Sequence, residues 1–409
     1  MDTAPARPMM PSADWRLGLT LAGQGIFPTM GAVLLVPLVP SIMAEFQAMP
    51  NGNLWVIALL AVPGLCIALF SPIAGLLADR YGKRRLLIAA LLLYGLAGAA
   101  PAVIRGYDGL LLTRAMLGVC EAVIMTLSAT LVVDLFAGRA RDRWLANISL
   151  LASIAGVIFA PLGGAIGAAA GWRTVALVYL LSLAFVPLML RYTREPARGA
   201  AVPAATPAAP FPWRKLAICG PATLFGSTLL YGMVFNEGVA FAQLGVTNPA
   251  TIGACLAVIG LSTPLGSLVF WKAGRLPTSI LLPLGYAIIG AGMIVSASGM
   301  PGLFVAGLAG ALFGCGLILP TVLRWTLQDV PPQTRGRCSG LFQSMLAAGQ
   351  FVGGIAVQGL AAGRGVIAAF GQIGMIAVGV AMLTALGFML ARRRDRQQPI
   401  DIAHEQFNR

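Results

Sequence analysis

Two charged side chains stand inside the apolar stretch "LLLTRAMLGVCEAVIM", at Arg114 and Glu121. If this stretch is a helix, their spacing of seven residues makes close to two turns, which puts both charges on one face about 10 Å apart along the axis. Each ion would cost about 2.5–3.5 kcal/mol near the centre of a bilayer. We therefore expect that face to look into the protein or into water.

Glu121 is the first candidate for a residue that binds a proton or contacts a substrate, because carboxyl groups within membrane spans usually serve function. Arg114 would then favour the ionised form of Glu121 through its opposite charge. The alternative is a structural contact that holds the helix to an Arg or Gln of a neighbour. Glu237, beside Asn236 near the end of another apolar run, is a second candidate, and a position at the membrane interface is its alternative.

Apolar runs of about 20 residues recur along almost the whole chain, and each is long enough to cross a hydrocarbon layer of about 30 Å. Hydrophobic residues make up 58% of the sequence and charged residues 10%, against roughly 25% charged residues in a soluble domain. We therefore predict an all-α integral membrane protein with 12 transmembrane helices. The runs lie near residues 17–43, 54–78, 86–104, 109–133, 144–169, 174–190, 216–241, 250–271, 278–299, 302–328, 338–362 and 366–391.

An Ala/Pro-rich stretch between the sixth and seventh runs has the composition of a linker. Asp134 and the basic residues after it are echoed by Asp329 and its basic neighbours, so the two halves resemble parallel copies. The predicted organisation is an N-terminal six-helix bundle at 1–192, a cytoplasmic linker at 193–213, a C-terminal six-helix bundle at 214–392 and a charged cytoplasmic tail at 393–409.

The chain carries 28 Lys and Arg residues against 14 Asp and Glu residues. If both termini are cytoplasmic, only Arg105, Arg173 and Arg364 fall on the outer side, whereas the reverse orientation inverts the imbalance. We therefore predict cytoplasmic N- and C-termini in a multi-pass protein of the cell (inner or plasma) membrane. Since no nucleic-acid-binding motif accompanies the positive charge, we expect no nucleic-acid partner.

Enzyme chemistry finds little support in the sequence. The single histidine, His404, lies in the charged tail, and the six cysteines show no metal-ligand spacing. No phosphate-binding GxxxxGK[ST] loop is present, so direct use of ATP by this chain is unsupported. We expect no enzymatic activity, no metal and no cofactor, with a proton gradient as the energy source.

The stretch "GLLADRYGKRR", residues 75–85, places charges and two glycines between the second and third apolar runs. Gly75 permits close helix contact, Gly82 supplies a turn, and Asp79 can accept hydrogen bonds from the end of a neighbouring helix. The pattern resembles the loop signature G-x-x-[small]-D-R-[FY]-G-[RK]-[RK]-[RK] of the major facilitator superfamily. The alternative is a plain anchor of positive charge. The resemblance implies a conformational switch that stabilises the outward-open state and is made of Gly75, Asp79, Arg80, Gly82, Arg84 and their partner Asp134.

Two further stretches are similar to this family. Leu110, Arg114 and Gly118 match its L-x-x-x-R-x-x-x-G pattern. In the fifth run, "GVIFAPLGGAIG" resembles the G-x-x-x-G-P-x-x-G-G of the 12-span drug:proton antiporters, although Ala160 replaces the glycine before the proline and Ala165 replaces the last glycine. Small residues and a proline predict a kinked helix that packs closely on its partner. The candidates for such helix packing are Gly118, Gly156, Pro161 and Gly164.

Polar and aromatic residues in several spans are candidates for the lining of a mostly apolar cavity. Gln343 and Gln350 lie seven residues apart and share a helix face. That face either lines the cavity or forms interhelical hydrogen bonds worth about 0.6 kcal/mol each. The cavity-lining candidates are Gln24, Phe27, Tyr231, Asn236, Gln343 and Gln350.

These residues and the resemblance together predict a secondary active transporter, with proton-coupled efflux (antiport) of small amphipathic or lipophilic organic compounds by alternating access. A nearly neutral site with one Arg and one Glu suits such compounds. The alternatives are a proton-coupled uptake symporter and a transport-inactive receptor or assembly factor of the same fold. The expected partners are a small-molecule substrate, protons and the lipid bilayer, and we expect the protein to function as a monomer.

Overall fold

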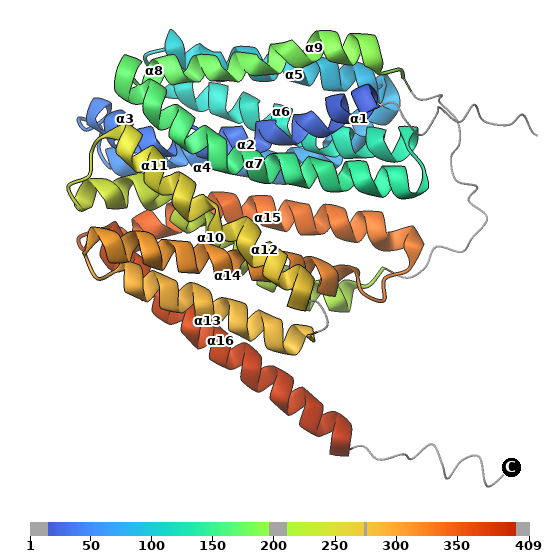
Figure 1. Cartoon of the computed structure of the whole chain (residues 1–409), viewed down its shortest axis with the longest axis vertical. Coiled ribbons are helices and arrows are strands. Elements are labelled where there is room, and N and C mark those ends of the chain that lie inside the picture. The colour runs from blue at the N-terminus through green and yellow to red at the C-terminus, as the bar shows by residue number, and fades with distance from the viewer. Residues whose placement is uncertain (1–14, 196–210, 274–275, 398–409) are drawn as a thin grey trace, which may run out of the picture.

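The computed structural model describes residues 15–195, 211–273 and 276–397, and every regular element in these ranges is a helix. Twelve of the helices or helix groups are long and apolar enough to cross a membrane, which confirms the predicted fold class and number of spans. The protein is therefore a multi-pass membrane protein, built from two six-helix bundles (Figure 1).

The first bundle opens with a span that changes helix type along its length. A 3₁₀ turn begins where Pro37 removes a backbone donor, and Pro40 opens the last α-helical piece. The span consists of α1 (Trp15–Ala22), η1 (Gly23–Gly25), α2 (Ile26–Val33), η2 (Val36–Leu38) and α3 (Val39–Glu45). The other five spans are α4 (Gly52–Tyr81), α5 (Lys83–Ala99) with η3 (Ala100–Ala102), α6 (Tyr107–Leu135), α7 (Gly138–Ala170), and α8 (Trp172–Val175) with η4 (Ala176–Leu180) and α9 (Leu181–Tyr192).

The second bundle contains one divided span, which begins with a capped helix. The Asn248 side chain accepts hydrogen bonds from the backbone N–H groups of Ala250 and Thr251, with Pro249 at the first helical position. The spans are α10 (Trp213–Gln243), α11 (Pro249–Gly260) with α12 (Ser262–Ala273), α13 (Thr278–Ser296), α14 (Pro301–Leu327), α15 (Pro332–Ala361) and α16 (Val366–Gln397).

We call the end of the molecule where α1 begins and α4 meets α5 the terminal end, and the opposite end, where α3 ends and α11 begins, the far end (Figure 1). At the terminal end the chain reverses between α4 and α5 at Gly82, whose φ of 95° favours glycine. The basic stretch 75–85 therefore lies at the terminal end.

The two bundles contact each other in their far-end halves. A Cβ added to Gly64 of α4 would lie 2.8 Å from the Gln350 side chain of α15, and one added to Gly164 of α7 would lie 2.3 Å from the Pro249 carbonyl oxygen. Towards the terminal end of the same α4 and α15, a Cβ on Gly75 or Gly340 would meet no atom within 4 Å. This conformation is therefore closed at the far end and open towards the terminal end.

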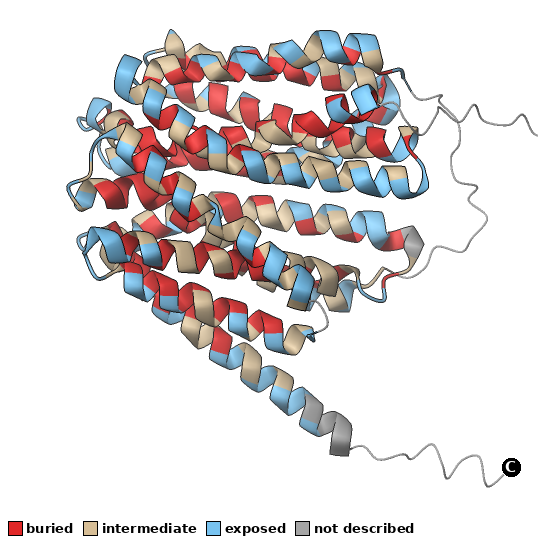
Figure 2. Cartoon of the chain, viewed as in Figure 1, coloured by how far each residue is buried: buried red, intermediate tan, exposed pale blue. Residues whose placement is uncertain are grey.

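In the helices at this contact, the buried residues are concentrated in the far-end halves (Figure 2). All buried residues of α7 lie from Ala155 onwards, in its far-end half. In α4 most of them lie between Val56 and Ile67, with only Ala74 and Ala78 nearer the terminal end.

Several helices extend beyond the apolar runs that predicted them. α7 begins at Gly138 rather than near residue 144, because Arg139, Arg141 and Arg143 are good helix formers at the exposed helix end. α15 likewise begins at Pro332 rather than near residue 338. Most of the predicted linker, residues 196–210, and the last part of the predicted tail, residues 398–409, lie outside the described residues.

Candidate substrate and proton site

The Glu121 side chain is buried at the contact between α6 and the first span, with 1% of its surface exposed. A Cβ added to Gly31 of α2 would lie 1.9 Å from Glu121 Oε1, so the carboxyl group occupies the space that a side chain at position 31 would need. No described residue forms a hydrogen bond with Oε1. An unpaired buried charge is costly, so this group is either neutral or needs a partner that another conformation supplies.

Arg114 lies in the same bundle but does not pair with Glu121, since no ion pair joins them among the described residues. Its Nη1 donates to the Tyr179 hydroxyl at 3.0 Å, and its guanidinium lies 5.2 Å from the centre of that ring. Nη2 is buried and makes no hydrogen bond to a described residue. Arg114 and Glu121 both lie on the side of α6 that is buried in the first bundle, as their spacing predicted, but they contact different residues.

Two cavity-lining candidates lie inside the first bundle in this conformation. Gln24 is fully buried, donates to the Thr20 carbonyl oxygen and accepts from the Ser128 hydroxyl. Phe27 is also fully buried and packs its ring on Tyr94 and Phe185. The reason is that the first span turns this face towards α6 and α9 rather than towards the second bundle.

Asn236 and Glu237 are neighbours in α10, but only Asn236 has hydrogen-bond partners that explain its position. Asn236 is fully buried, donates to the carbonyl oxygens of Gly232 and Gly354, and accepts from Gln358 of α15. It therefore ties α10 to α15 in this conformation. Glu237 is 4% exposed, and its Oε1 has no partner among the described residues, so it is buried rather than interfacial.

The other three cavity-lining candidates come from the second bundle. The Tyr231 ring lies 5.6 Å from that of Phe235. Gln350 is buried against Gly64 of α4 and so belongs to the contact between bundles. Gln343, on the same helix face nearer the terminal end, is exposed.

The predicted switch at residues 75–85 does meet Asp134, but through a different cation. Lys83 Nζ lies 2.6 Å from Asp134 Oδ2. Arg84 instead donates to the Thr193 hydroxyl and the Leu190 carbonyl oxygen, both in the last turn of α9 or just after it.

The remaining switch residues are not gathered in this conformation. Asp79 is exposed and forms no hydrogen bond or ion pair with another residue of the described ranges. Arg80 is exposed, with its guanidinium 5.5 Å from the centre of the Tyr81 ring. Gly75 faces open space, so the close helix contact expected there is absent while the terminal end is open.

The four helix-packing candidates lie at helix contacts. A Cβ on Gly118 would meet the backbone of Pro63 in α4 at 2.5 Å. Pro161 and Gly164 lie against Gly253 of α11 in the other bundle. Gly156 is looser, because a Cβ there would lie an ordinary 3.6 Å from Thr29. The motif of the fifth span thus forms part of the contact that closes the far end.

Sequence reasoning missed residues that shape the site. Gly31 carries no signal of its own in a span whose apolar interior has no carboxyl group, and Tyr179 is one aromatic residue among many. At the far end, Arg173 pairs with Glu45 at 2.5 Å, and the Trp172 indole donates to the same carboxylate. In the sequence, Trp172 and Arg173 stand in the short stretch "GWR", residues 171–173, which could have been noticed. Nothing in the sequence marks Glu45 as the partner of these two residues.

Comparison with known proteins places the chain among membrane transporters. It is 25% identical over 346 residues to the 3-(3-hydroxy-phenyl)propionate transporter of Escherichia coli, covering 80% of this chain and 82% of that protein. It is 26% identical over 336 residues to the class G tetracycline resistance protein of Vibrio anguillarum, covering 77% and 83% of the two chains. A third similarity, 28% identity to the multidrug resistance protein fnx1 of Schizosaccharomyces pombe, covers 39% of this chain but only 29% of that protein.

The fold is shared with a solved structure. The inward-open structure of the xylose transporter XylE from Escherichia coli superposes with a TM-score of 0.74 at 11% identity, covering 90% of this chain and 95% of that one. The sequence profile of the Major Facilitator Superfamily matches residues 21–354. With twelve spans in two bundles and a match over most of its length, the chain belongs to the Major Facilitator Superfamily and is a transporter of that family.

Proposed function

We propose that this transporter is a proton-coupled exporter of small amphipathic or lipophilic organic compounds, with Glu121 as its proton-binding residue. The observation that carries the proposal is the buried Glu121 carboxyl group, whose Oε1 lacks a partner among the described residues and lies beside Gly31. A carboxylic acid is tolerated in such a place, whereas a carboxylate needs a counter-charge or water. Rocking of the bundles opens the site to one side of the membrane at a time, and this links proton uptake on one side and proton release on the other to the conformational change.

Orientation follows from the basic residues. The stretch 75–85 lies at the terminal end, as do the first and last residues of each bundle. The positive charge of these segments supports a cytoplasmic position for the terminal end. Under this assignment the conformation is open to the cytoplasm and closed to the outside by the far-end contacts. A substrate for export enters from the terminal end and displaces the proton of Glu121 into the cytoplasm, and Glu121 takes up another proton from the outside after the bundles have rocked.

The character of the substrate follows from what surrounds Glu121. The cluster of Ile67, Ala122 and Ala347, with Met125 packed on it, is apolar and lies where α4, α6 and α15 meet. Few polar groups in an apolar setting suit amphipathic or lipophilic molecules, and the names of the tetracycline and multidrug resistance relatives support export of such compounds.

Proton-coupled uptake is a second candidate, favoured by one observation. Arg114 keeps a buried Nη2 without a partner in the described part of the chain, and an aromatic acid offers a carboxylate that would bind it. The relative named as a 3-(3-hydroxy-phenyl)propionate transporter matches 80% of the chain. In that case protons and substrate move in the same direction.

The test measures proton movement in proteoliposomes of known orientation that contain a pH-sensitive dye. Each compound from a panel of lipophilic cations, neutral antibiotics and aromatic acids is added to vesicles with the native chain, with Glu121→Gln or with Glu195→Gln. Glu195 is the matched control because its carboxylate lies at the terminal end, bonded to the Arg84 backbone N–H, outside the buried site.

Export predicts that a compound and protons move in opposite directions, that Glu121→Gln abolishes the proton movement while the compound still binds, and that Glu195→Gln retains it. Protons that accompany an aromatic acid into the vesicle would establish the uptake symporter instead. Unchanged coupling in Glu121→Gln would remove Glu121 from the mechanism and direct attention to Glu237. If the native chain transports no compound of the panel, the receptor or assembly factor becomes the better description.

A further inference from the structure

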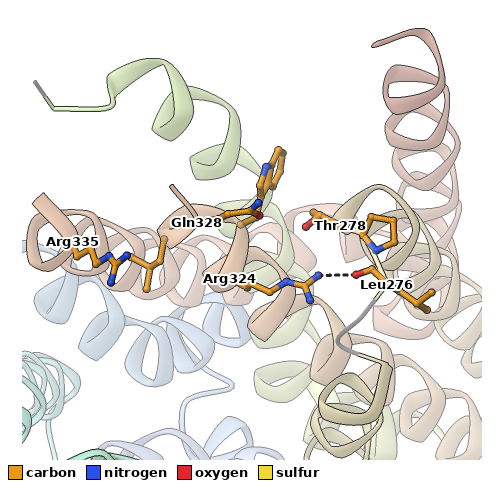
Figure 3. A pocket seen from close by; sticks show the side chains of 8 residues that line it. Leu276, Thr278, Arg324, Gln328 and Arg335 are labelled. Carbon is orange, nitrogen blue, oxygen red and sulfur yellow. Dashed lines mark hydrogen bonds between the residues drawn. The ribbon is translucent and has the colours of Figure 1, made fainter. Parts of the chain in front are cut away.

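A pocket of about 770 Å³ opens at the terminal end of the second bundle, away from Glu121 and its neighbours. It lies where α14 ends, between the start of α13 and the first turns of α15 (Figure 3). Its volume falls within the range of about 300–1,000 Å³ that is usual for small-molecule sites. The lining residues are Leu276, Pro277, Thr278, Arg324, Trp325, Leu327, Gln328 and Arg335.

Two arginines on different helices form the charged part of the wall. Arg324 is held in place, because its Nη2 donates to the Leu276 carbonyl oxygen at 3.0 Å and its guanidinium lies 5.1 Å from the centre of the Phe270 ring. Arg335 enters from α15 (Figure 3). Its Nε donates to the Val330 carbonyl oxygen at 2.9 Å. Its two terminal nitrogens form no hydrogen bond with another described residue, so they are available to a ligand.

The rest of the wall adds donors and an apolar surface. The Trp325 ring packs on Phe388 of α16, and its indole N–H has no partner in the described ranges. Lys215 donates from α10 to the Gln328 carbonyl oxygen at the pocket rim, which adds a third positive charge. None of the described lining residues is acidic. Asp329, next to Gln328 in sequence, is exposed and forms no ion pair within the described ranges.

We propose that this pocket binds the phosphate group of an anionic phosphate ester, either a lipid headgroup or a soluble molecule. Arginine presents a planar fork of N–H donors that matches phosphate oxygens, and Arg335 keeps its terminal nitrogens for that use. Trp325 and Leu327 supply an apolar surface for the carbon part of the ester. The helix ends around the pocket lie at the level where headgroups and soluble anions meet a membrane protein.

A purely structural role accounts for only part of this arrangement. Arg324 stabilises the joint before α13 through Leu276, and Arg335 satisfies one carbonyl group with a single nitrogen. These two hydrogen bonds do not explain why both guanidinium groups line the same pocket. They also do not explain why none of the described residues that line it is acidic. The proposal does not depend on the direction of transport or on Glu121.

Native mass spectrometry of the full-length chain tests the proposal. The purified protein is incubated separately with phosphatidylglycerol, with zwitterionic phosphatidylcholine and with glycerol 3-phosphate, and the bound adducts are counted. Arg335→Gln removes the available charge, and Arg337→Gln is the matched control, because Arg337 is exposed on the same helix but does not line the pocket.

We expect the native chain to retain one phosphatidylglycerol or one glycerol 3-phosphate more strongly than phosphatidylcholine. Arg335→Gln should weaken that adduct about tenfold, the usual effect of losing a hydrogen bond to a charged group, whereas Arg337→Gln should keep it. If the chain retains glycerol 3-phosphate, a soluble phosphate ester is sufficient for binding. If it retains phosphatidylglycerol but not glycerol 3-phosphate, binding also needs the acyl chains. No preference for an anionic phosphate, or equal losses in both variants, would overturn the proposal.

Discussion

Gly31→Ala is the most selective perturbation of the Glu121 site that the structure offers. The new Cβ would lie 1.9 Å from Glu121 Oε1, 3.0 Å from Cδ and 3.2 Å from a methyl carbon of Leu117. The carboxyl oxygen must therefore move by about 1.5 Å to reach 3.4 Å, where ordinary contact begins. The displaced atom is the end of a flexible side chain, so we expect the fold to survive with a loss of about 1–3 kcal/mol in stability.

Transport should suffer far more than stability. A misplacement of about 1 Å at a reacting group costs roughly 100-fold in rate, so Gly31→Ala should lower the rate of coupled proton movement by about that factor. The assay combines proton flux in proteoliposomes with thermal unfolding of the purified protein. Gly156→Ala is the matched control, because its Cβ would lie 3.6 Å from Thr29 and displace nothing.

A double variant makes the reasoning sharper. Glu121→Asp shortens the side chain by one methylene and withdraws the carboxyl group from position 31, so it should restore part of the activity lost in Gly31→Ala. The two changes should therefore be non-additive by about 0.5–3 kcal/mol. Native proton coupling in Gly31→Ala, or equal losses in Gly31→Ala and Gly156→Ala, would refute the idea that Gly31 positions the carboxyl group.

Three further perturbations test the conformation. Asp134→Asn breaks the partly exposed pair with Lys83 and should lower stability by only about 0.2–1 kcal/mol, as measured by thermal unfolding. In a cysteine-free background, Gly75→Cys should react rapidly with a water-soluble maleimide and Gly354→Cys slowly, because only Gly75 faces open space. Gly164→Ala should weaken the far-end contact by about 1–3 kcal/mol and slow labelling at position 75, because its Cβ meets the backbone of α11.

Each of these tests has a control or a contrary outcome. Asp142→Asn breaks a more exposed pair with Arg141 and should change nothing measurable, so an equal loss there would assign no special role to Asp134. Labelling of Gly75→Cys only from outside the cell would reverse the orientation. Faster labelling at position 75 in Gly164→Ala would contradict the link between the two ends.

The sequence was sufficient to predict the number of spans and the division into two bundles, because the bilayer requires long apolar helices. It was less informative on where the helices end. α7 continues through Arg139, Arg141 and Arg143 at the terminal end, since a helix does not need apolar residues once it leaves the hydrocarbon layer. The breaks in the first span, near Pro37 and Pro40, also depend on packing as well as on the prolines.

For the site, helical spacing placed Arg114 and Glu121 on one face but could not choose their neighbours. Arg114 bonds to Tyr179 and Glu121 lies against Gly31, and both contacts depend on how other spans are rotated about their axes. Gln24 is a polar residue of the kind expected to line a cavity, yet its amide group forms its hydrogen bonds with Ser128 and Thr20 inside the bundle. Periodicity reports which residues share a face, whereas the neighbour on that face is decided by the tertiary structure.

The most direct measurement of the central proposal is infrared difference spectroscopy of the protein in membranes, which detects the carbonyl stretch of a protonated carboxyl group. The native chain in this conformation should show a band of this kind that disappears when substrate or high pH removes the proton, and Glu121→Gln should lack it. An unchanged band in Glu121→Gln, or a native spectrum without any such band, would contradict the assignment of Glu121 as the proton-binding residue.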